Sequence, residues 1–232
     1  MSKQAVILAG GKGTRLLPYT VSLPKPLMPI GEYPILEIVI RQLVAFGFDT
    51  VTMAVNHQAD IIKAFFQDGE KWGINIKYSL EDKPLSTMGP LKLISELPEN
   101  FLVMNGDVLS DLNYGAFLDN HADNGRLFTI SASSRNDKVD YGVLRVNSDG
   151  ILTEFEEKPV NSYLVSMCIY ALNRVVLGYI PEDIPFGFDD LMYKFLAENQ
   201  KVKVIPHDGY WLDIGRPDDY ARAIEDYEKL DF

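Results

Sequence analysis

Through its first 125 residues the chain alternates short apolar runs with segments whose apolar residues recur at helical spacing. The short runs predict buried strands at 4–8, 50–55, 75–78 and 101–104. The helical spacing predicts helices at 35–46, 59–66, 91–97 and 114–120. Strands that alternate with helices in this way favour a mostly parallel sheet with helices on both faces.

After residue 127 the pattern changes to strands in succession, predicted at 127–133, 141–146, 151–155 and 164–172. The turn Ser148-Asp149-Gly150 indicates a hairpin between the second and third of them. Helices return at 189–198 and 218–230, and no repeat or linker is visible. We therefore expect one α/β domain over 1–232, a Rossmann-like three-layer α/β/α fold with a mixed, mostly parallel central sheet.

The segment 9–34 fits neither pattern. It holds four glycines and five prolines, too many for a helix or a central strand, so it predicts a long ordered loop. Ordered loops of this length inside a compact domain are usually functional. The first 31 residues also carry four Lys and Arg and no Asp or Glu, whereas the whole chain has a net charge of −11. The alternative is that these basic residues cluster by chance on a solvent-exposed face.

Composition narrows the classes of protein that remain. The acidic net charge disfavours a nucleic-acid binder, because duplex binding needs a broad basic face. A single cysteine excludes an internal disulfide framework. We see neither a signal-peptide layout nor an apolar run of the ~20 residues that span a bilayer. We therefore expect no membrane partner and a cytoplasmic location.

The loop opens with Leu8-Ala9-Gly10-Gly11-Lys12-Gly13-Thr14-Arg15-Leu16, directly after the first predicted strand. Glycines let backbone N–H groups approach a polyanion, and the two basic residues supply the opposite charge. The motif is not a Walker A loop, since Gly13 follows Lys12 in place of Ser or Thr. It is not a dinucleotide fingerprint either, since Leu16 occupies the third glycine position. A tight turn with incidental basic residues is the alternative.

Two further motifs follow along the chain. In Pro24-Lys25-Pro26 the prolines fix the backbone, so the lysine is held in one direction, unless it is an ordinary surface lysine. In Asn105-Gly106-Asp107 the carboxylate follows a predicted strand, at the sheet edge where α/β proteins bind ligands. A carboxylate there suits Mg²⁺, which takes one or two carboxylates beside water and phosphate. An Asx turn or a helix cap is the alternative.

The last two motifs are weaker as isolated strings. In Glu156-Glu157-Lys158-Pro159 the lysine could hold a phosphate and Glu157 could accept hydrogen bonds from sugar hydroxyls, although an exposed charged turn explains the string as well. In the segment 209–215, Asp213 sits among apolar and glycine residues. A charge in such surroundings needs a metal or a partner. The alternative is a capping aspartate beside a core tryptophan.

Taken in order, these motifs resemble the sugar-phosphate nucleotidyltransferases, or nucleotide-sugar pyrophosphorylases, over nearly the whole chain. The string LAGGKGTRL, followed after seven residues by PKPLMPIGEYPIL, is highly specific, and NGD, YG, EKP and WLDIGRPDDY add to it in sequence. Among subclasses, the stretch 26–93 looks most like guanylyltransferases for mannose 1-phosphate or heptose 1-phosphate. The resemblance implies a nucleotide-binding half of about 1–125 and a sugar-phosphate-binding half of about 126–232.

The resemblance also assigns residues. It implies that the nucleotide binds at Leu8, Ala9, Gly10, Gly11, Gly13, Thr14, Arg15, Lys25, Gly89 and Asp107. It implies that the sugar phosphate binds at Gly142, Glu157 and Lys158 and that Mg²⁺ binds at Asp107 and Asp213. The residues expected to carry catalysis are Arg15, Lys25, Asp107, Lys158 and Asp213. The substrates would be an NTP and a sugar 1-phosphate, and a homo-oligomer would be consistent with many relatives.

Three positions depart from the usual pattern of that family. Leu85-Ser86-Thr87-Met88-Gly89 stands where Leu-Gly-Thr-Ala-Gly is frequent, Cys168 where a glycine is common, and Arg216 where a threonine is frequent. Each either alters specificity or is neutral drift.

The expected reaction is in-line attack of a sugar-phosphate oxygen on the α-phosphorus of the NTP, GTP being favoured, with pyrophosphate leaving. UTP, CTP or dTTP, or a non-sugar phosphate acceptor, are alternatives for the same chemistry. A non-catalytic regulatory subunit that binds nucleotide sugars would be expected to lose Arg15, Lys25, Asp107 or Asp213, and the chain retains all four. The failed glycine spacing disfavours a dehydrogenase.

Overall fold

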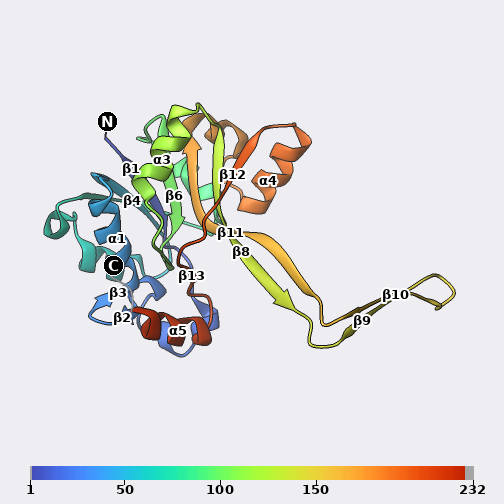
Figure 1. Ribbon diagram of the computed structural model, residues 1–232. Helices are drawn as coiled ribbons and strands as arrows, with labels where there is room; N and C mark the ends of the chain where they lie inside the picture. The colour runs from blue at the N-terminus through green and yellow to red at the C-terminus, as the bar shows by residue number, and fades with distance from the viewer. Residues whose placement is uncertain (1, 228–232) are drawn as a thin grey trace.

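A seven-stranded sheet forms the centre of the computed structural model, which describes residues 2–227 (Figure 1). The strand order is β12-β8-β11-β6-β1-β4-β5. The strands are β1 (Gln4–Leu8), β4 (Thr50–Val55), β5 (Asn75–Leu80), β6 (Asn100–Asn105), β8 (Phe128–Lys138), β11 (Val160–Asn173) and β12 (Val202–Pro206). Only β11 runs antiparallel to its neighbours within this sheet, so the predicted mixed, mostly parallel sheet is confirmed.

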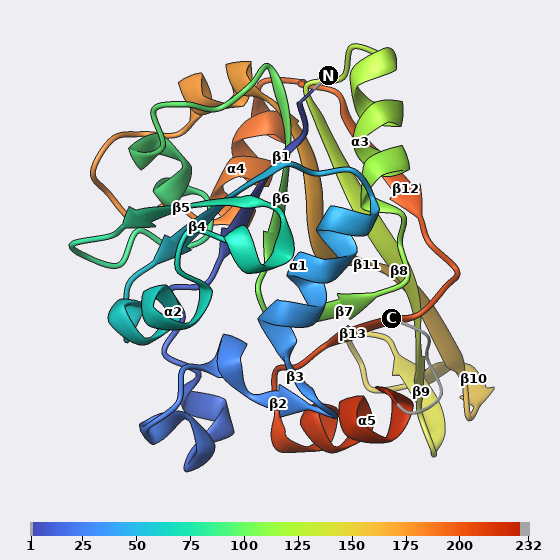
Figure 2. The ribbon, with the colours of Figure 1, turned by 90° about the vertical axis from the view of Figure 1, so that its left-hand side faces the viewer.

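Helices cover both faces of the sheet, which confirms the three-layer fold (Figure 2). One face carries α1 (Ile35–Ala45), α2 (Ala59–Phe66) and α3 (Tyr114–Asp123), and the other carries α4 (Phe188–Ala197) and a 3₁₀ turn (Arg174–Tyr179). The side chains of β1 show why both faces need cover. Ala5 and Ile7 belong to the apolar cluster of the first face and Val6 to that of the second, as the alternation of a strand requires.

A third apolar cluster lies below the carboxyl ends of the strands and orders the loop 9–34. That loop contains three 3₁₀ turns (Thr14–Leu16, Tyr19–Val21 and Lys25–Leu27) and the short pair β2 (Pro29–Ile30) and β3 (Tyr33–Pro34). Buried Leu16, Met28 and Ile30 pack with residues of β7 (Val108–Ser110), β13 (Trp211–Asp213) and α5 (Pro217–Tyr227). The loop is therefore ordered, as predicted, because these three buried apolar side chains hold it against the rest of the protein.

Strands β8 and β11 continue beyond the sheet as a two-stranded ribbon that projects from the body (Figure 1). The ribbon ends in the antiparallel pair β9 (Gly142–Val146) and β10 (Leu152–Glu157), which confirms the hairpin predicted at Ser148-Asp149-Gly150. Residues 134–165 are called the arm below. Both long strands exceed their predicted lengths, because the polar run at 134–138 carries no apolar signal.

One predicted element is wrong and several were missed. The helix expected at 91–97 is a 3₁₀ turn, Gly89–Leu93, after which Ile94 is extended. Pro98 disfavours helical backbone at Leu97, and an extended path also brings Leu97 into the apolar cluster. The sequence patterns missed β7, β12, β13 and the 3₁₀ turn Arg174–Tyr179. The last predicted helix corresponds to α5, and its residues 228–230 lie outside the described part of the chain. None of the helices within 2–227 has the length and apolarity that crossing a membrane requires.

Candidate active site

A cavity of about 410 Å³ opens at the carboxyl ends of β1, β4, β5 and β6. Open α/β sheets bind ligands at this edge because loops there leave the sheet toward opposite faces. The first strand contributes its end and the glycine segment, and the neighbouring strands contribute polar residues directly after their last positions. The lining residues are Leu8, Ala9, Gly10, Gly11, Lys12, Lys25, Pro26, Asn56, Glu81, Pro84, Ser86, Thr87, Pro90, Asn105, Gly106 and Asp107.

Only the first part of the glycine segment lines this cavity. Leu8 to Gly11 form one wall, whereas Gly13 and Thr14 are outside the lining residues. Gly13 has a φ of 62°, and a Cβ there would stand 2.9 Å from Thr20 Cγ2. The Thr20 hydroxyl donates a 2.8 Å hydrogen bond to the Gly13 carbonyl and holds this turn. The turn sends Arg15 to a second cavity, described below.

Lys25 and Asp107 form an ion pair at the edge of the first cavity. Lys25 opens a 3₁₀ turn between Pro24 and Pro26, and its ammonium donates to Asp107 Oδ2. Both side chains are largely buried, with 12% and 19% exposed. The other carboxylate oxygen, Asp107 Oδ1, is buried and has no hydrogen-bond partner within 2–227. A buried, unpartnered carboxylate oxygen is costly unless a cation or a ligand satisfies it.

Asp213 reaches the same place through the short pair of strands β7 and β13. These strands run antiparallel with Asp213 opposite Val108, and the Ile214 amide donates to the Asp107 carbonyl at 3.1 Å. Burial raises the pKa of Asp213, and the negative charge of Asp107 raises it further, against the opposing charges of Lys25 and Arg15. Two adjacent carboxylates, one with a free oxygen, fit a hard oxygen-seeking cation such as Mg²⁺.

Asp213 lines a second cavity, of about 600 Å³, whereas Lys25 and Asp107 line the first. Four arginines line the second cavity, Arg15, Arg135, Arg216 and Arg222, together with Asp213 and Asp219. Ser133, Ser134 and Arg135 place the root of the arm at its rim. Such a set of guanidinium groups suits a polyanion, since each can bind phosphate in a bidentate manner. Arg216, one of the three departures from the family pattern, strengthens this positive charge.

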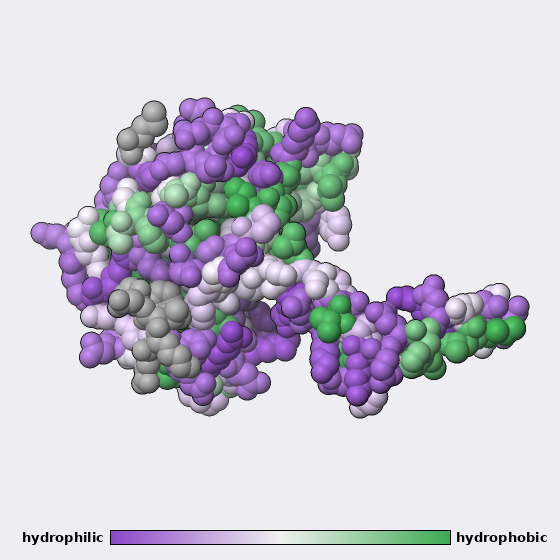
Figure 3. Space-filling model, viewed as in Figure 1, coloured by the Kyte–Doolittle hydropathy of each residue, from purple (hydrophilic) through white to green (hydrophobic). Residues whose placement is uncertain are grey.

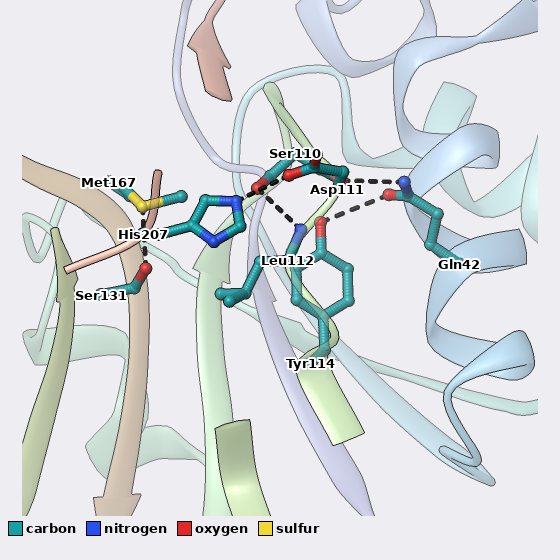
Figure 4. Close-up of polar contacts among 8 residues, drawn as sticks. All are labelled: Gln42, Ser110, Asp111, Leu112, Tyr114, Ser131, Met167 and His207. Atoms are coloured by element: carbon teal, nitrogen blue, oxygen red, sulfur yellow. Dashed lines mark hydrogen bonds and ion pairs between the residues drawn. The ribbon is translucent and has the colours of Figure 1, made fainter. Parts of the chain in front are cut away.

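Hydrogen bonds at the carboxyl end of β7 hold the strand that follows Asp107 (Figure 4). Gln42 of α1 donates to the Ser110 carbonyl at 2.9 Å and accepts from the Tyr114 hydroxyl at 3.3 Å. The Leu112 amide donates to Ser110 Oγ, and His207 contacts Asp111 Oδ1 at 2.6 Å. β7 is thus tied to α1, α3 and the segment after β12, which leaves the neighbouring carboxylate little freedom.

Cys168 lies beside the carboxylate pair, at an irregularity in the β8–β11 ladder between Ser166 and Tyr170. Its φ of 58° is in the left-handed region, which explains why a glycine is common at this position in the family that the motifs resemble. Burial and the charge of Asp213 raise the pKa of the thiol to about 11, so the thiol is neutral near pH 7. A neutral thiol is a poor nucleophile, which agrees with a packing role.

Several lining residues were missed from the sequence, Asn56, Glu81 and Thr87 among them. Asn56 follows β4 and Glu81 follows β5, so the same strand-end rule that singled out Asp107 would have found both. Gly89, predicted to bind the nucleotide, is buried and is not among the lining residues. Its amide donates to the Phe186 carbonyl at 3.0 Å, and Ser86, Thr87 and Pro90 face the cavity in its place.

Gly142, Glu157 and Lys158 all lie on the arm, and none of them lines either cavity. Gly142 pairs with Glu157 across the β9–β10 ladder. The side chains of Glu157 and Lys158 are 60% and 57% exposed. Within one chain the structure therefore brings together Lys25, Asp107 and Asp213, with Arg15 close by, and leaves the predicted sugar-phosphate residues apart from them (Figure 1).

Comparison with known sequences gives the site a context. A family model described as nucleotidyl transferase matches residues 4–230. The chain is 33% identical over 226 residues to a mannose-1-phosphate guanyltransferase of Candida albicans, covering 94% of this chain and 62% of that protein. It is also 33% identical over 241 residues to a UTP–glucose-1-phosphate uridylyltransferase of Synechocystis, covering 95% and 62%. The chain thus spans about three-fifths of the length of these relatives.

A solved structure gives a similar result over a full chain. HddC from Yersinia pseudotuberculosis superposes with a TM-score of 0.75 at 28% identity, covering 97% of this chain and 99% of HddC. The same protein complexed with GMP-PN superposes with a TM-score of 0.74 at 27% identity. The similarity therefore covers nearly the whole of both chains, and HddC has also been solved complexed with GMP-PN.

Proposed function

Because the chain belongs to the nucleotidyl transferase family, we propose that it joins a sugar 1-phosphate to a nucleoside triphosphate, preferably GTP, and releases pyrophosphate. The observation that carries this proposal is the meeting of Asp107, Asp213 and Lys25 at the edge of a glycine-walled cavity. A cavity of this size can hold a nucleoside. Asp107 at its edge, with Asp213 next to Asp107, would then stand close to the phosphates.

The glycine segment would bind the nucleoside by shape. Leu8 to Gly11 continue β1 along the cavity wall, and their backbone N–H and C=O groups would contact the nucleoside. Gly11 has open space at its Cβ position, so the backbone there is accessible to a phosphate or a ribose. Lys12 lines the same wall and adds positive charge.

Glu81 supports a preference for guanine. It is 9% exposed, its Oε2 accepts a 3.1 Å bond from the Leu85 amide, and it lines the cavity beside Gly10. Burial raises the pKa of this carboxyl, so a ligand that donates to it would stabilise its charged form. Guanine offers two adjacent donors, its ring N–H and its amino group, whereas the other bases place an acceptor next to their donor. Relatives named as guanyltransferases, and the GMP-PN complex of HddC, agree with this assignment.

The chemical problem is to bring two polyanions into contact. A triphosphate carries about four negative charges and a sugar phosphate about two, and each like-charge pair ~4 Å apart repels by ~1 kcal/mol in water. Lys25 and Arg15 would offset this charge on the triphosphate side. Mg²⁺ held by Asp107 and Asp213 would neutralise phosphate charge and orient the α-phosphate.

The sugar-phosphate oxygen would attack the α-phosphorus in line with the leaving group. One P–O bond forms to the incoming phosphate, and the bond between the α-phosphorus and the bridging oxygen breaks, with its electron pair leaving on pyrophosphate. The attacking oxygen is already anionic, so no general base is required. Catalysis then rests on positioning and on electrostatic stabilisation of the transition state.

The sugar phosphate would be bound by Lys158, which contacts its phosphate, and by Glu157, which accepts from the sugar hydroxyls. Gly142 would provide room next to them. A Cβ at Gly142 would stand 2.6 Å from the Phe155 ring, so any larger residue would displace that ring.

The experiment is a grid of pyrophosphate-release assays with Mg²⁺. It crosses GTP, CTP, UTP, dTTP and ATP with the 1-phosphates of mannose, glucose, heptose and N-acetylglucosamine. We expect GTP to be preferred. The Glu81→Gln variant should lose at least tenfold in kcat/KM for GTP, because the amide NH2 group replaces a carboxylate oxygen that would accept a hydrogen bond from guanine. Asp82→Asn, an exposed neighbour, is the control. Silence across the grid, from folded protein that binds a nucleotide sugar, would instead favour a regulatory subunit or a non-sugar acceptor.

A further inference from the structure

The tip of the arm has one apolar face that nothing within residues 2–227 covers. Leu144 pairs with Phe155, and Val146 pairs with Leu152, so these four side chains share a face. They are 63%, 60%, 59% and 55% exposed, in that order. The opposite face is charged, with Arg145 and Glu154 in a 3.0 Å ion pair. Figure 3 shows the apolar residues gathered along one side of the arm tip.

A ribbon with one apolar and one charged face is typical of a sheet whose apolar face packs against another element or another protein. A two-stranded antiparallel ribbon is marginal in water by itself, and its apolar face is normally buried. Five more large apolar side chains on the arm or its junctions are over half exposed, namely Tyr141, Ile151, Val160, Tyr163 and Leu164. Such side chains each leave roughly 50–100 Å² in water. Together they offer several hundred Å², close to the ~800 Å² that one partner contributes to a standard interface.

The backbone directs the arm away from the cavities of its own chain. The ladder between β8 and β11 is continuous from Val165 opposite Ser133 to Val160 opposite Lys138. Side chains reinforce it, since the Ser162 hydroxyl donates to Asn136 Oδ1 at 2.7 Å. Lys158 lies beyond the outer end of this ribbon. One chain alone therefore presents the nucleotide half of the proposed site without its sugar-phosphate half.

We infer that the arm crosses to a second copy of this chain, packs its apolar face there, and delivers Glu157 and Lys158 to that copy's carboxylate pair. The inference rests on the proposed function, which requires these residues beside the sugar phosphate. A two-fold axis makes the exchange reciprocal, so each dimer has two complete sites, each built from both chains.

Charge complementarity supports this occupant. The cavity at the root of the arm is lined by four arginines and two aspartates, whereas the strand that precedes Lys158 carries Glu154, Glu156 and Glu157. An acidic strand approaching an arginine-lined cleft is attracted, and the attraction favours one register of docking. The root residues Ser134 and Arg135 already border that cleft, so a two-fold related arm would pass along the same rim.

The decisive experiment is complementation within a mixed dimer. Asp107→Asn damages the carboxylate site, and Lys158→Ala damages the arm. The two variants are co-expressed with different affinity tags, and dimers that carry both tags are isolated. If arms are exchanged, each mixed dimer keeps one intact site and regains about half of the wild-type turnover. If each arm serves its own chain, both sites of the mixed dimer are defective, and absence of turnover overturns the inference.

A second measurement does not depend on activity. Light scattering at micromolar concentration should give twice the chain mass of 26.2 kDa. The double variant Leu144→Glu/Phe155→Glu should be monomeric, whereas Leu196→Glu, at an exposed apolar position on α4, should remain dimeric. Circular dichroism confirms that each variant is folded. A monomeric wild type, or a dimer that survives the arm substitutions, overturns the inference. A wild type that is inactive across the substrate grid would refute the proposed function alone. The masses of the wild type and of the arm variants would still test whether the arms hold two copies together.

Discussion

The two carboxylates of the site are adjacent but differ in how their charges are compensated. Asp107 is paired with the buried ammonium of Lys25, and that pairing also satisfies Lys25. Asp213 is half-buried, has no ion pair of its own within 2–227, and has a pKa raised by burial and by Asp107. A carboxyl whose pKa is raised on folding contributes stability below its unfolded pKa and loses that contribution as pH rises through the folded pKa. At neutral pH the charge of Asp213 therefore costs stability.

We expect opposite stability effects from two isosteric variants. Asp107→Asn should lower the free energy of unfolding by about 1–3 kcal/mol, because it leaves Lys25 buried without a counter-charge. Asp213→Asn should raise it at pH 7.5, because it removes a repelled charge. Both variants should lose most of their turnover. Thermal denaturation and pyrophosphate release measure the two quantities.

The same denaturation series with MgCl₂ adds a control. A cation that binds only the folded state raises its stability. Mg²⁺ should therefore raise the melting temperature of the wild type and leave that of both variants nearly unchanged. Equal Mg²⁺ effects in all three proteins would show that the ion binds elsewhere.

His121 gives a prediction that is independent of the site. It is fully buried on α3, its Nδ1 lies 2.8 Å from Thr129 Oγ1, and its Nε2 has no partner within 2–227. Burial, assisted by Arg126, lowers its pKa to about 4. A lowered pKa contributes stability above the unfolded value and loses it as pH falls. The free energy of unfolding should therefore decrease between pH 6.5 and 4, by up to about 1.4 kcal/mol per pH unit.

Urea denaturation at several pH values tests that slope. His121→Gln should flatten it, whatever its effect at pH 7, and His57→Gln, at an exposed position, should leave it as in the wild type. An unchanged slope in His121→Gln would assign the pH dependence to other groups.

At the level of residues, the sequence motifs singled out three charged side chains that the structure brings together, but not the full lining of the cavity beside them. Lys25, Asp107 and Asp213 stood out because prolines, glycines or apolar residues surround a charge. Glu81 and Asn56 also follow strand ends, but neither has an adjacent glycine such as Gly106, which draws attention to Asp107. The left-handed backbone of Cys168 is a further property that the residue type conceals.

At the level of elements, the glycines of the loop have two different roles, which the composition of the segment does not distinguish: one allows a turn of the backbone and the other leaves room in the cavity. Gly13 has a positive φ and close neighbours, whereas Gly11 has open space at its Cβ position and lines the cavity. Gly13→Ala should destabilise the fold by about 1–3 kcal/mol, because it combines a left-handed backbone with a clash against Thr20.

Gly11→Ala is the matched variant for that prediction. Its stability should stay within about 0.5 kcal/mol of the wild type, while its KM for the nucleotide rises because the new methyl group enters the cavity. Urea denaturation and steady-state kinetics of both variants provide the comparison. Equal destabilisation by the two substitutions would contradict this division of roles.

Element boundaries were predictable where packing agreed with local pattern. The predicted bounds of β1, β4 and α2 match the structure because each has a clear apolar face and a clear end. β7 and β13 have three residues each, too few to show a period, yet their pairing places Asp213 beside Asp107. The helix at 91–97 was wrong because helical spacing also suited an extended segment before Pro98.

At the level of the whole molecule, the sheet topology followed from the order of strands and helices, but the arm did not. Its strands continue through the polar run 134–138, where the ladder is held by backbone hydrogen bonds that need no apolar side chains. The division into a nucleotide half and a sugar-phosphate half remains a prediction. Strands from both halves share the central sheet, so the halves are not separate bodies.

The central claim is that this carboxylate pair supports nucleotidyl transfer to a sugar 1-phosphate. The most direct test is Mg²⁺-dependent formation of GDP-mannose from GTP and mannose 1-phosphate by wild-type and Asp107→Asn proteins, followed by mass spectrometry and pyrophosphate release. We predict one pyrophosphate per nucleotide sugar in the wild type and a loss of at least a hundredfold in the variant, on the order of 3 kcal/mol in the barrier. Equal turnover by the two proteins, or pyrophosphate released without a nucleotide sugar, would contradict the account.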